Sequence, residues 1–407
     1  MSSKQQATHG SAGEVFRVFL KLGLTSFGGP IAHLGYFRTE LSERRRWVND
    51  EQYAQLVALC QFLPGPASSQ VGFALGLYRA GLRGALAAFL AFTLPSAALL
   101  TLFAYGASWF SGTIGHGMLS GLKIVAVAII AQAVLGMAKS LTPDAIRASI
   151  AVVAALAALL LGGSLGQVLA IVLGLIAGYF LCRVPPAARA ADAVVPLRFV
   201  ISRRTGILSL LALFILLVGT PIAVAVLGWE ALSLFDAFYR SGALVFGGGH
   251  VVLPLLQGAV VDTGWVPNQD FLAGYGVAQA VPGPLFTIAA YLGAISTVGP
   301  GGVLGASIAL CAIFLPGFFL LVGVLPFWNV VAGHRRVQAL MRGANAAVVG
   351  ILAAALYSPV FTSAVTGPAQ FGLGLLCFLL LVSWKLPPWS VVVIGALGGV
   401  LMALVGI

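Results

Sequence analysis

Residues 61–66 read Gln-Phe-Leu-Pro-Gly-Pro, and residues 279–284 read Gln-Ala-Val-Pro-Gly-Pro. A second pair of segments has nearly the same separation, because 27–30 is Phe-Gly-Gly-Pro and 246–249 is Phe-Gly-Gly-Gly. A separation this constant indicates that the chain contains a duplicated unit. A duplicated apolar unit that is interrupted by Gly and Pro is typical of membrane transporters.

The composition places the chain in a lipid bilayer. It is 60% hydrophobic and 8% charged, whereas a soluble domain has about 25% charged residues. Many apolar runs approach the ~20 residues that cross a bilayer, which predicts an all-α polytopic membrane protein. The nine expected full spans lie at 88–108, 124–138, 150–180 (two passes), 206–228, 303–327, 344–357, 371–384 and 389–406.

The net charge of +11 is better explained by membrane topology than by nucleic acid, because Lys and Arg accumulate in cytoplasmic loops. Loop 38–51 contains four arginines, whereas its second-half equivalent, 258–270, has no Lys or Arg and carries Asp262 and Asp270. These loops are therefore expected on opposite sides of the membrane. The span at 206–228 has no counterpart in the first half, and one added span turns the second half over. The repeats are therefore expected to be inverted, with a pseudo-two-fold axis in the membrane plane, and inverted halves require this opposition of the loops.

The inversion gives an expected domain organisation. We expect an N-terminal membrane repeat at 1–182, a cytoplasmic linker at 183–205, an extra inverting transmembrane helix at 206–229 and a C-terminal membrane repeat at 230–407. The N-terminus is then cytoplasmic, and the C-terminus is periplasmic or extracellular. A homodimer is the assembly expected by default.

The duplicated motifs interrupt helices that are too short to cross a bilayer. Segments 14–27 and 51–63 are each about 20 Å long as helix, which favours re-entrant hairpins over full spans. We name the turning points tip 1 (27–30), tip 2 (64–66), tip 3 (246–249) and tip 4 (282–284). The prediction is therefore about nine full spans with four re-entrant hairpins, and the alternative is thirteen spans.

The tips are the expected binding site. Each one exposes the N-terminus of a returning helix, where unpaired N–H groups and a partial positive charge attract an anion. Hydroxyl and amide groups beside the tips can bind the oxygens of a tetrahedral oxyanion. The candidate substrate-binding residues are Thr25, Ser26, Phe27, Gly28, Gly29, Pro30, Gln61, Pro64, Gly65, Pro66, Ser68, Ser69, Gln70, Gly247, Gly248, Gly249, Gln279, Pro282, Gly283, Pro284 and Thr287.

Few charged or titratable residues lie in the predicted membrane segments, so each is a candidate for charge compensation or coupling. Lys21 and Arg240 are repeat equivalents, and they either face a divalent anion or extend to the interface. Asp236 is expected to pair with Arg240 four residues later, and it is also a candidate proton carrier. His33 and His250 follow tips 1 and 3 and titrate in the physiological range. Lys123 has no assigned role.

No enzyme signature is present, because the sequence lacks the His-Glu-x-x-His, Gly-x-Ser-x-Gly and Walker-type motifs. The four cysteines have no metal-ligand spacing, so we expect neither a metal nor a cofactor. Without an ATP site, transport is expected to be secondary, or the protein is a channel.

Three first-half segments resemble the chromate ion transporter family in its two-domain, long-chain form. They are Gly-Leu-Thr-Ser-Phe-Gly-Gly-Pro-Ile-Ala-His-Leu-Gly-Tyr-Phe at 23–37, Arg-Arg-Arg-Trp at 44–47 and Leu-Pro-Gly-Pro-Ala-Ser-Ser-Gln at 63–70. Leu-Pro-Ser at 94–96 and the second-half motifs fit the same pattern. The resemblance implies a bacterial inner-membrane carrier that exports chromate and confers resistance, with sulfate as a similar ligand.

The resemblance carries over to residues of tips 1 and 2 and their neighbours, namely Phe27, Gly28, Gly29, Pro30, His33, Gln61, Pro64, Gly65, Pro66, Ser68, Ser69 and Gln70. The second half departs from it at Gly249, which replaces Pro30, and at 285–286, which replace Ala67 and Ser68. We therefore expect the first half to contribute more to the site. The alternatives are a sulfate or oxyanion importer, or an anion channel of the same fold.

Overall fold

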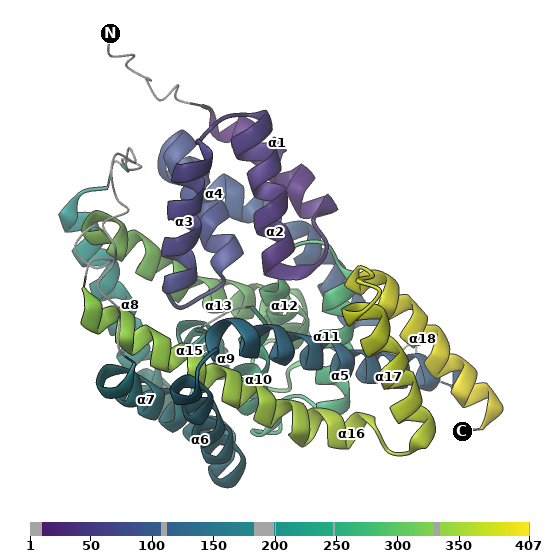
Figure 1. Ribbon diagram of the computed structural model, residues 1–407. Coiled ribbons are helices and arrows are strands. Elements are labelled where there is room, and N and C mark those ends of the chain that lie inside the picture. Colours follow the sequence, from purple (N-terminus) through teal and green to yellow (C-terminus); the bar gives the residue numbers. More distant parts are fainter. Residues whose placement is uncertain are drawn as a thin grey trace.

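The computed structural model of the protein describes residues 10–106, 112–182, 199, 201–246, 249–328 and 334–406. These residues form helices and connecting turns, with no strand among them (Figure 1). The first-half helices are α1 (Ala12–Thr25), α2 (Gly29–Phe37), α3 (Asp50–Phe62), α4 (Ala67–Gly106), α5 (Thr113–Leu141), α6 (Ala145–Leu161) and α7 (Gly163–Leu181), with a π-helical turn at Arg38–Arg44.

The second half repeats this order after α8 (Arg203–Leu227). Its helices are α9 (Glu230–Ala243), α10 (Val252–Leu256), α11 (Asn268–Ala280), α12 (Ile288–Ile295), α13 (Gly302–Val324), α15 (Arg335–Ala355), α16 (Thr362–Ala364), α17 (Pro368–Val382) and α18 (Pro388–Val405). Short turns η3 (Gly249–Val251), η4 (Gln257–Val261), η5 (Leu285–Thr287), η6 (Leu325–Phe327) and η7 (Leu356–Phe361) join or extend them.

The first two hairpins enter from and return to one side of the molecule. The Gly10 N–H donates to the Arg79 carbonyl at 3.1 Å, so the chain before α1 lies beside the end of the second hairpin. The arms of the first hairpin are antiparallel, because Phe19 of α1 and Phe37 of α2 are in ring contact on either side of tip 1. We call the side that contains Gly10, 38–50 and Arg79 the basic face.

Helix α4 is two helices joined by a turn. Ala80 and Gly81 have non-helical backbone angles, and Gly81 has φ +62°, a conformation that favours glycine. The segment before this turn is the returning arm of the second hairpin, and the segment after it crosses the molecule. At the far end of that crossing, the Tyr105 hydroxyl accepts from the Val303 N–H at 3.2 Å.

The second-half hairpins enter from the face opposite to the basic face. The Gly299 N–H, which follows α12, donates to the Glu230 carboxylate at the start of α9, and the Thr297 N–H donates to the Trp265 carbonyl. All of these residues lie at the Val303 side, where the α4 crossing ends. The prediction of two inverted repeats with broken helices is confirmed.

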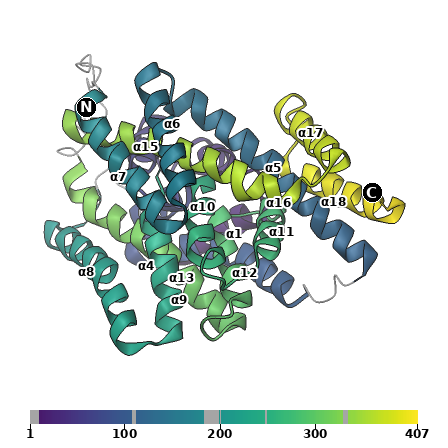
Figure 2. The same cartoon turned by 90° about the horizontal axis from the view of Figure 1, so that it is seen from below.

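The helices have the lengths of a polytopic membrane protein. Among the described residues, six are long and apolar enough to cross a membrane: α4, α5, α8, α13, α15 with its extension, and α18. Helices α6, α7 and α17 are shorter and apolar, and together these nine correspond to the nine predicted spans. Figure 2 shows α17 and α18 beside α5, and α8 beside α9.

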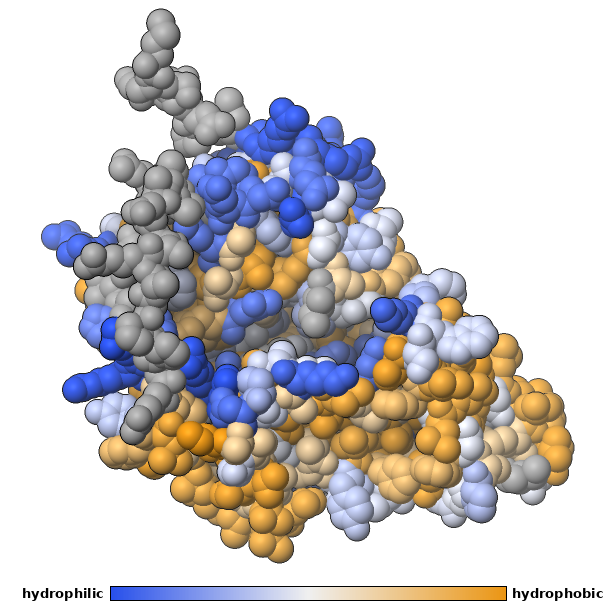
Figure 3. Space-filling model, viewed as in Figure 1, coloured by the Kyte–Doolittle hydropathy of each residue, from blue (hydrophilic) through white to orange (hydrophobic). Residues whose placement is uncertain are grey.

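The surface agrees with this reading. In Figure 3, hydrophilic residues gather over α1, α2 and α3, and hydrophobic residues cover α6, α7, α17 and α18. Leu160, Leu165 and Phe180 on α6 and α7 are exposed, as are Leu397 and Leu401 on α18. Exposed apolar helices of this kind are stable only in lipid.

Matched glycines set how each repeat packs. Gly23 of α1 lies against the backbone of Phe92 on α4, and its equivalent, Gly242 of α9, lies against the backbone of Ile313 on α13. A side chain at either glycine would push the entering hairpin arm away from the crossing helix. Both hairpins therefore hold their tips at a fixed depth.

Candidate functional site: the junction of the four tips

The four tips meet in the interior and exchange hydrogen bonds between the repeats. The Gly65 N–H of tip 2 donates to the carbonyl of Val245, beside tip 3, at 2.7 Å. The Gly283 N–H of tip 4 donates to the carbonyl of Ser26, beside tip 1, at 3.0 Å. These two bonds join equivalent positions in opposite directions, so the pseudo-two-fold axis passes between them.

Tips 1 and 3 touch each other near this axis. A Cβ atom on Gly249 would lie 2.7 Å from Pro30 Cγ, which is closer than two carbon atoms can pack. Pro30 and Gly249 are repeat equivalents, and two prolines would collide here. This contact explains why the second repeat departs from the first at Gly249.

The start of α4 brings polar groups to the junction. Ala67 to Ser69 form its first turn, so their N–H groups have no partner within the helix. Gln70 is fully buried, and its Nε2 donates to the carbonyls of Pro64 and Gly317 at 2.9 Å each. Gln70 therefore ties tip 2 to α13 of the other repeat.

The equivalent region of the second repeat is closed by hydroxyl groups. The Thr287 hydroxyl donates to the carbonyl of Pro284 at 2.6 Å and bonds to the Ser96 hydroxyl of α4, also at 2.6 Å. Pro282 and Gly283 are buried beside them. Tip 4 is thus tied to the first repeat as tip 2 is tied to the second.

Buried polar atoms without a partner gather on the first-repeat side. Among the described residues they include Ser26 Oγ, His33 Nε2, Ser69 Oγ, Gln70 Oε1 and Thr93 Oγ1. A buried polar atom that has no hydrogen bond costs about 1–3 kcal/mol. A concentration of such atoms beside two helix N-termini fits a site that binds a polar ligand.

The histidines contact the junction differently. His33 is fully buried, its Nδ1 lies 3.5 Å from Ser68 Oγ, and its ring packs edge-on against Phe92. His250 Nδ1 bonds to the Tyr275 hydroxyl at 2.8 Å, and a Cβ on Gly29 would lie 3.9 Å from His250 Nε2. Both histidines therefore lie at tip 1 or its contact with tip 3.

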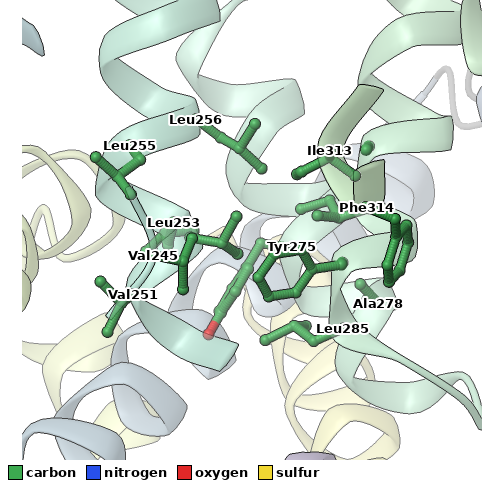
Figure 4. Close-up of a cluster of buried hydrophobic side chains, with 14 of the residues drawn as sticks. Val245, Val251, Leu253, Leu255, Leu256, Tyr275, Ala278, Leu285, Ile313 and Phe314 are labelled. Carbon is green, nitrogen blue, oxygen red and sulfur yellow. The ribbon is translucent and has the colours of Figure 1, made fainter. Parts of the chain in front are cut away.

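The second-repeat side of the junction is mainly apolar. Figure 4 shows Val245, Val251, Leu253, Leu285 and Tyr275 in one cluster of buried hydrophobic side chains. The buried amide of Gln279 adds one unpartnered Nε2. The contrast with the first repeat agrees with its expected larger contribution, which stays a prediction.

Several candidate residues lie away from the junction or have other contacts. Gln61 is exposed, although its equivalent Gln279 is buried. Thr25 is exposed and donates to the Lys21 carbonyl, and the Phe27 ring contacts Trp389. Gly247 and Gly248 lie outside the described residues.

The two candidate cations have carboxylate partners. Lys21 Nζ lies 3.9 Å from Oε2 of Glu40. Arg44 contacts the same oxygen at 2.8 Å, and Arg45 contacts Oε1 at 2.8 Å. Burial works to raise the pKa of Glu40, but the Arg45 hydrogen bond and the three positive charges outweigh it, so its pKa lies below the ordinary value.

The predicted pairing of Arg240 with Asp236 is confirmed. The two side chains are 2.6 Å apart, and Asp236 also accepts from the Thr220 hydroxyl of α8. Both Lys21 and Arg240 are more than half exposed. Each therefore lies at the exposed flank of its hairpin arm. Asp236 compensates the charge of Arg240 directly. Lys21 shares the single carboxylate of Glu40 with two arginines, so that cluster keeps a net positive charge.

The duplication has a counterpart among known families. The family model described as Chromate transporter matches the chain twice, at residues 13–179 and 232–400. The chain belongs to the chromate transporter family. Each match covers one inverted repeat, so each repeat of the transporter supplies one family unit and the pair of units forms the junction.

Similar proteins cover most of the transporter. A chromate transport protein of Pseudomonas aeruginosa is 28% identical over 84% of this chain and 79% of that protein. A probable chromate transport protein of Synechococcus elongatus is 29% identical over 95% of both chains. A chromate transport protein of Cupriavidus metallidurans is 27% identical over 93% of this chain and 90% of that protein. No solved structure matches the transporter.

Sequence reasoning did not single out Thr93 or Ser96 of the transporter as site residues. Both lie on α4 near Pro95, whose repeat equivalent is Pro316. The available signal was a Pro at equivalent positions within the two crossing helices, beside residues that contact tips 2 and 4. Ser96 lies against Gly283, and Gly317 lies against Gly65.

Proposed function

We propose that the protein is a secondary active transporter that exports chromate across the bacterial cytoplasmic membrane and confers chromate resistance. The observation that supports this most directly is the tip junction, where helix N-termini and unpartnered polar atoms meet inside an apolar protein. Membership of a transporter family supports transport over catalysis.

The junction offers the chemistry that a tetrahedral dianion needs. The first-turn N–H groups of α2 and α4 and the hydroxyls of Ser26 and Ser69 are hydrogen-bond donors, and His33 Nε2 donates in one tautomer. Donors that are already held in place replace the water lost by the anion at little further cost. Chromate and sulfate share this geometry, so sulfate is proposed as a competing ligand.

The proposed orientation of the protein in the membrane follows from the position of the basic face. This face carries Arg38 and Arg44 to Arg46, so it is assigned to the cytoplasm, with the N-terminus cytoplasmic and the C-terminus periplasmic. An inside-negative potential then drives the anion outward by about 2.3 kcal/mol per charge per 100 mV. His33 and His250 are the side chains through which proton exchange would add to this drive.

The test is accumulation of radiolabelled chromate in chromate-sensitive cells, with and without excess sulfate and a protonophore. Cells that express the protein should accumulate less chromate than empty-vector cells, and collapse of the gradient should remove the difference. The double variant Ser26→Ala/Ser69→Ala should behave as empty vector, and Ser140→Ala, on the exposed surface of α5, should behave as wild type. Equal or higher accumulation in expressing cells would reject export and favour import or conduction.

A further inference from the structure

Among the described residues, the inverted fold leaves two basic side chains, Lys123 and Arg240, in the half of the protein opposite to the basic face. The accumulation of Lys and Arg in cytoplasmic loops does not account for them there. Arg240 forms a 2.6 Å ion pair with Asp236. Lys123 has no such direct ion pair among the described residues, although the charge of Asp270 on α11 acts on it. A half-buried cation in a membrane helix calls for a functional reason.

Lys123 lines a polar cavity of about 180 Å³ between α5, α16, α17 and α18. His116 and Ser120 line it from α5, Thr366 from the turn before α17, and Gln370 from the first turn of α17. Their side chains all carry hydrogen-bond donors, and no carboxylate lines this cavity. Figure 2 shows α16 and α17 beside α5 at this place.

Close helix packing keeps the cavity small. Gly117 and Gly121 of α5 lie against the backbone of Gly399 and Gly395 on α18, and Gly117 and Gly399 themselves line the cavity. A neighbouring cavity of about 460 Å³ is lined by Val127, Leu356, Phe371 and other apolar side chains. The contrast between the two indicates that a charged occupant suits the first and not the second.

We propose that this cavity is a second oxyanion site at the outer mouth, with Lys123 as its positive charge. The role of this cavity in transport rests on the proposed function: an anion that leaves the tip junction toward the outside would pass this weaker site before release. Lys123 would hold the anion, and Asp270 would compete with the anion for Lys123 and keep the affinity low.

A reporter cysteine measures the charge preference of the cavity without any transport. Thr366 is exposed and lines the cavity, whereas Thr362, four residues earlier, is exposed and does not. Thr366→Cys and Thr362→Cys would be labelled in intact cells with the membrane-impermeant reagents 2-sulfonatoethyl methanethiosulfonate, an anion, and its trimethylammonium counterpart. The unsubstituted chain gives the background from Cys311, which is exposed.

At Thr366→Cys, the anionic reagent should react faster relative to the cationic one than at Thr362→Cys. The positive charge of Lys123, across this cavity, should change the labelling rate of each reagent about threefold, in opposite directions. The ratio of the anionic to the cationic rate should therefore shift about tenfold. Lys123→Gln should remove the shift, Lys123→Arg should keep it, and Lys139→Gln, at the other end of α5, should leave it unchanged. External sulfate should slow the anionic reagent at Thr366→Cys alone.

Asp270→Asn separates an anion site from a structural ion pair. If Lys123 serves only to pair with Asp270, both neutral variants should disturb the cavity in the same way. An anion site predicts opposite effects, because Asp270→Asn removes a competitor and should increase the anionic preference. Equal rate ratios at the two reporter cysteines, or labelling of Thr366→Cys only from the cytoplasm, would overturn the proposal. Failure of chromate export alongside the expected labelling would instead overturn the proposed function and leave the anion site standing.

Discussion

The contact between Pro30 and Gly249 gives a quantitative test of the tip junction. Gly249→Ala would place a Cβ atom 2.7 Å from Pro30 Cγ and 3.5 Å from Pro30 Cδ. The nearest atom of any other residue, Leu285 Cδ2, is at 3.9 Å, an ordinary van der Waals distance. Gly249 is not among the glycines with left-handed backbone, so alanine brings no backbone strain. Pro30 is therefore the one neighbour that must move, by about 1 Å to reach ordinary carbon contact.

Overpacking of this kind costs about 1–3 kcal/mol, which should lower the melting temperature of the purified protein in detergent by several degrees. Because tips 1 and 3 are forced apart, chromate accumulation should rise toward the empty-vector value. Pro30→Ala removes the ring atoms that obstruct the new methyl group. Gly249→Ala should therefore cost almost nothing in that background, which gives a coupling energy of about 1–3 kcal/mol. An equal loss in both backgrounds would refute the contact and the placement of these tips.

Three further substitutions test neighbouring parts of the account. Gln70→Ala removes both hydrogen bonds that this buried amide donates, including the one to Gly317 of the other repeat, so it should lower the melting temperature and abolish export, whereas Gln61→Ala, at an exposed position, should do neither. Lys21→Ala and Arg240→Ala should each weaken chromate resistance without loss of expression, and full resistance in both would exclude a role for this cation pair. The pKa of Glu40 is lowered, so its ion pairs stabilise the folded protein above the ordinary glutamate pKa, and this stabilisation is lost as pH falls. Glu40→Gln should therefore lower the melting temperature at pH 7 and have a smaller effect near pH 4.

The four helix breaks could be predicted from the sequence because adjacent Gly and Pro residues determine them locally. Pro-Gly-Pro and Gly-Gly cannot continue a helix, so the sequence predicts four breaks in symmetric pairs. Helix segments of about 20 Å before each break predict hairpins, and Gly10 beside Arg79 agrees with this. Inversion followed from the single extra span at 206–228, and the unequal basic content of loops 38–51 and 258–270 agreed with it.

The contacts of individual side chains could not be predicted in this way. Gln61 and Gln279 are equivalent in sequence, yet one is exposed and the other buried, because the surroundings of each tip depend on the helices that pack around it. Lys21 meets Glu40 only because a π-helical turn follows α2 and brings that carboxylate back to α1. Ser96 meets Thr287 across 191 residues of chain. Such contacts depend on tertiary packing, which no local pattern encodes.

Binding of radiolabelled chromate to purified protein is the most direct test that the tips form the substrate site. Ser26→Ala/Ser69→Ala removes two buried hydroxyls that have no partner, so the melting temperature should stay level or rise. A hydrogen bond to a charged group contributes about 1.5–3 kcal/mol, so binding should weaken at least tenfold, with Ser140→Ala as the unchanged control. Chromate affinity equal to wild type in a well-folded double variant would contradict the account.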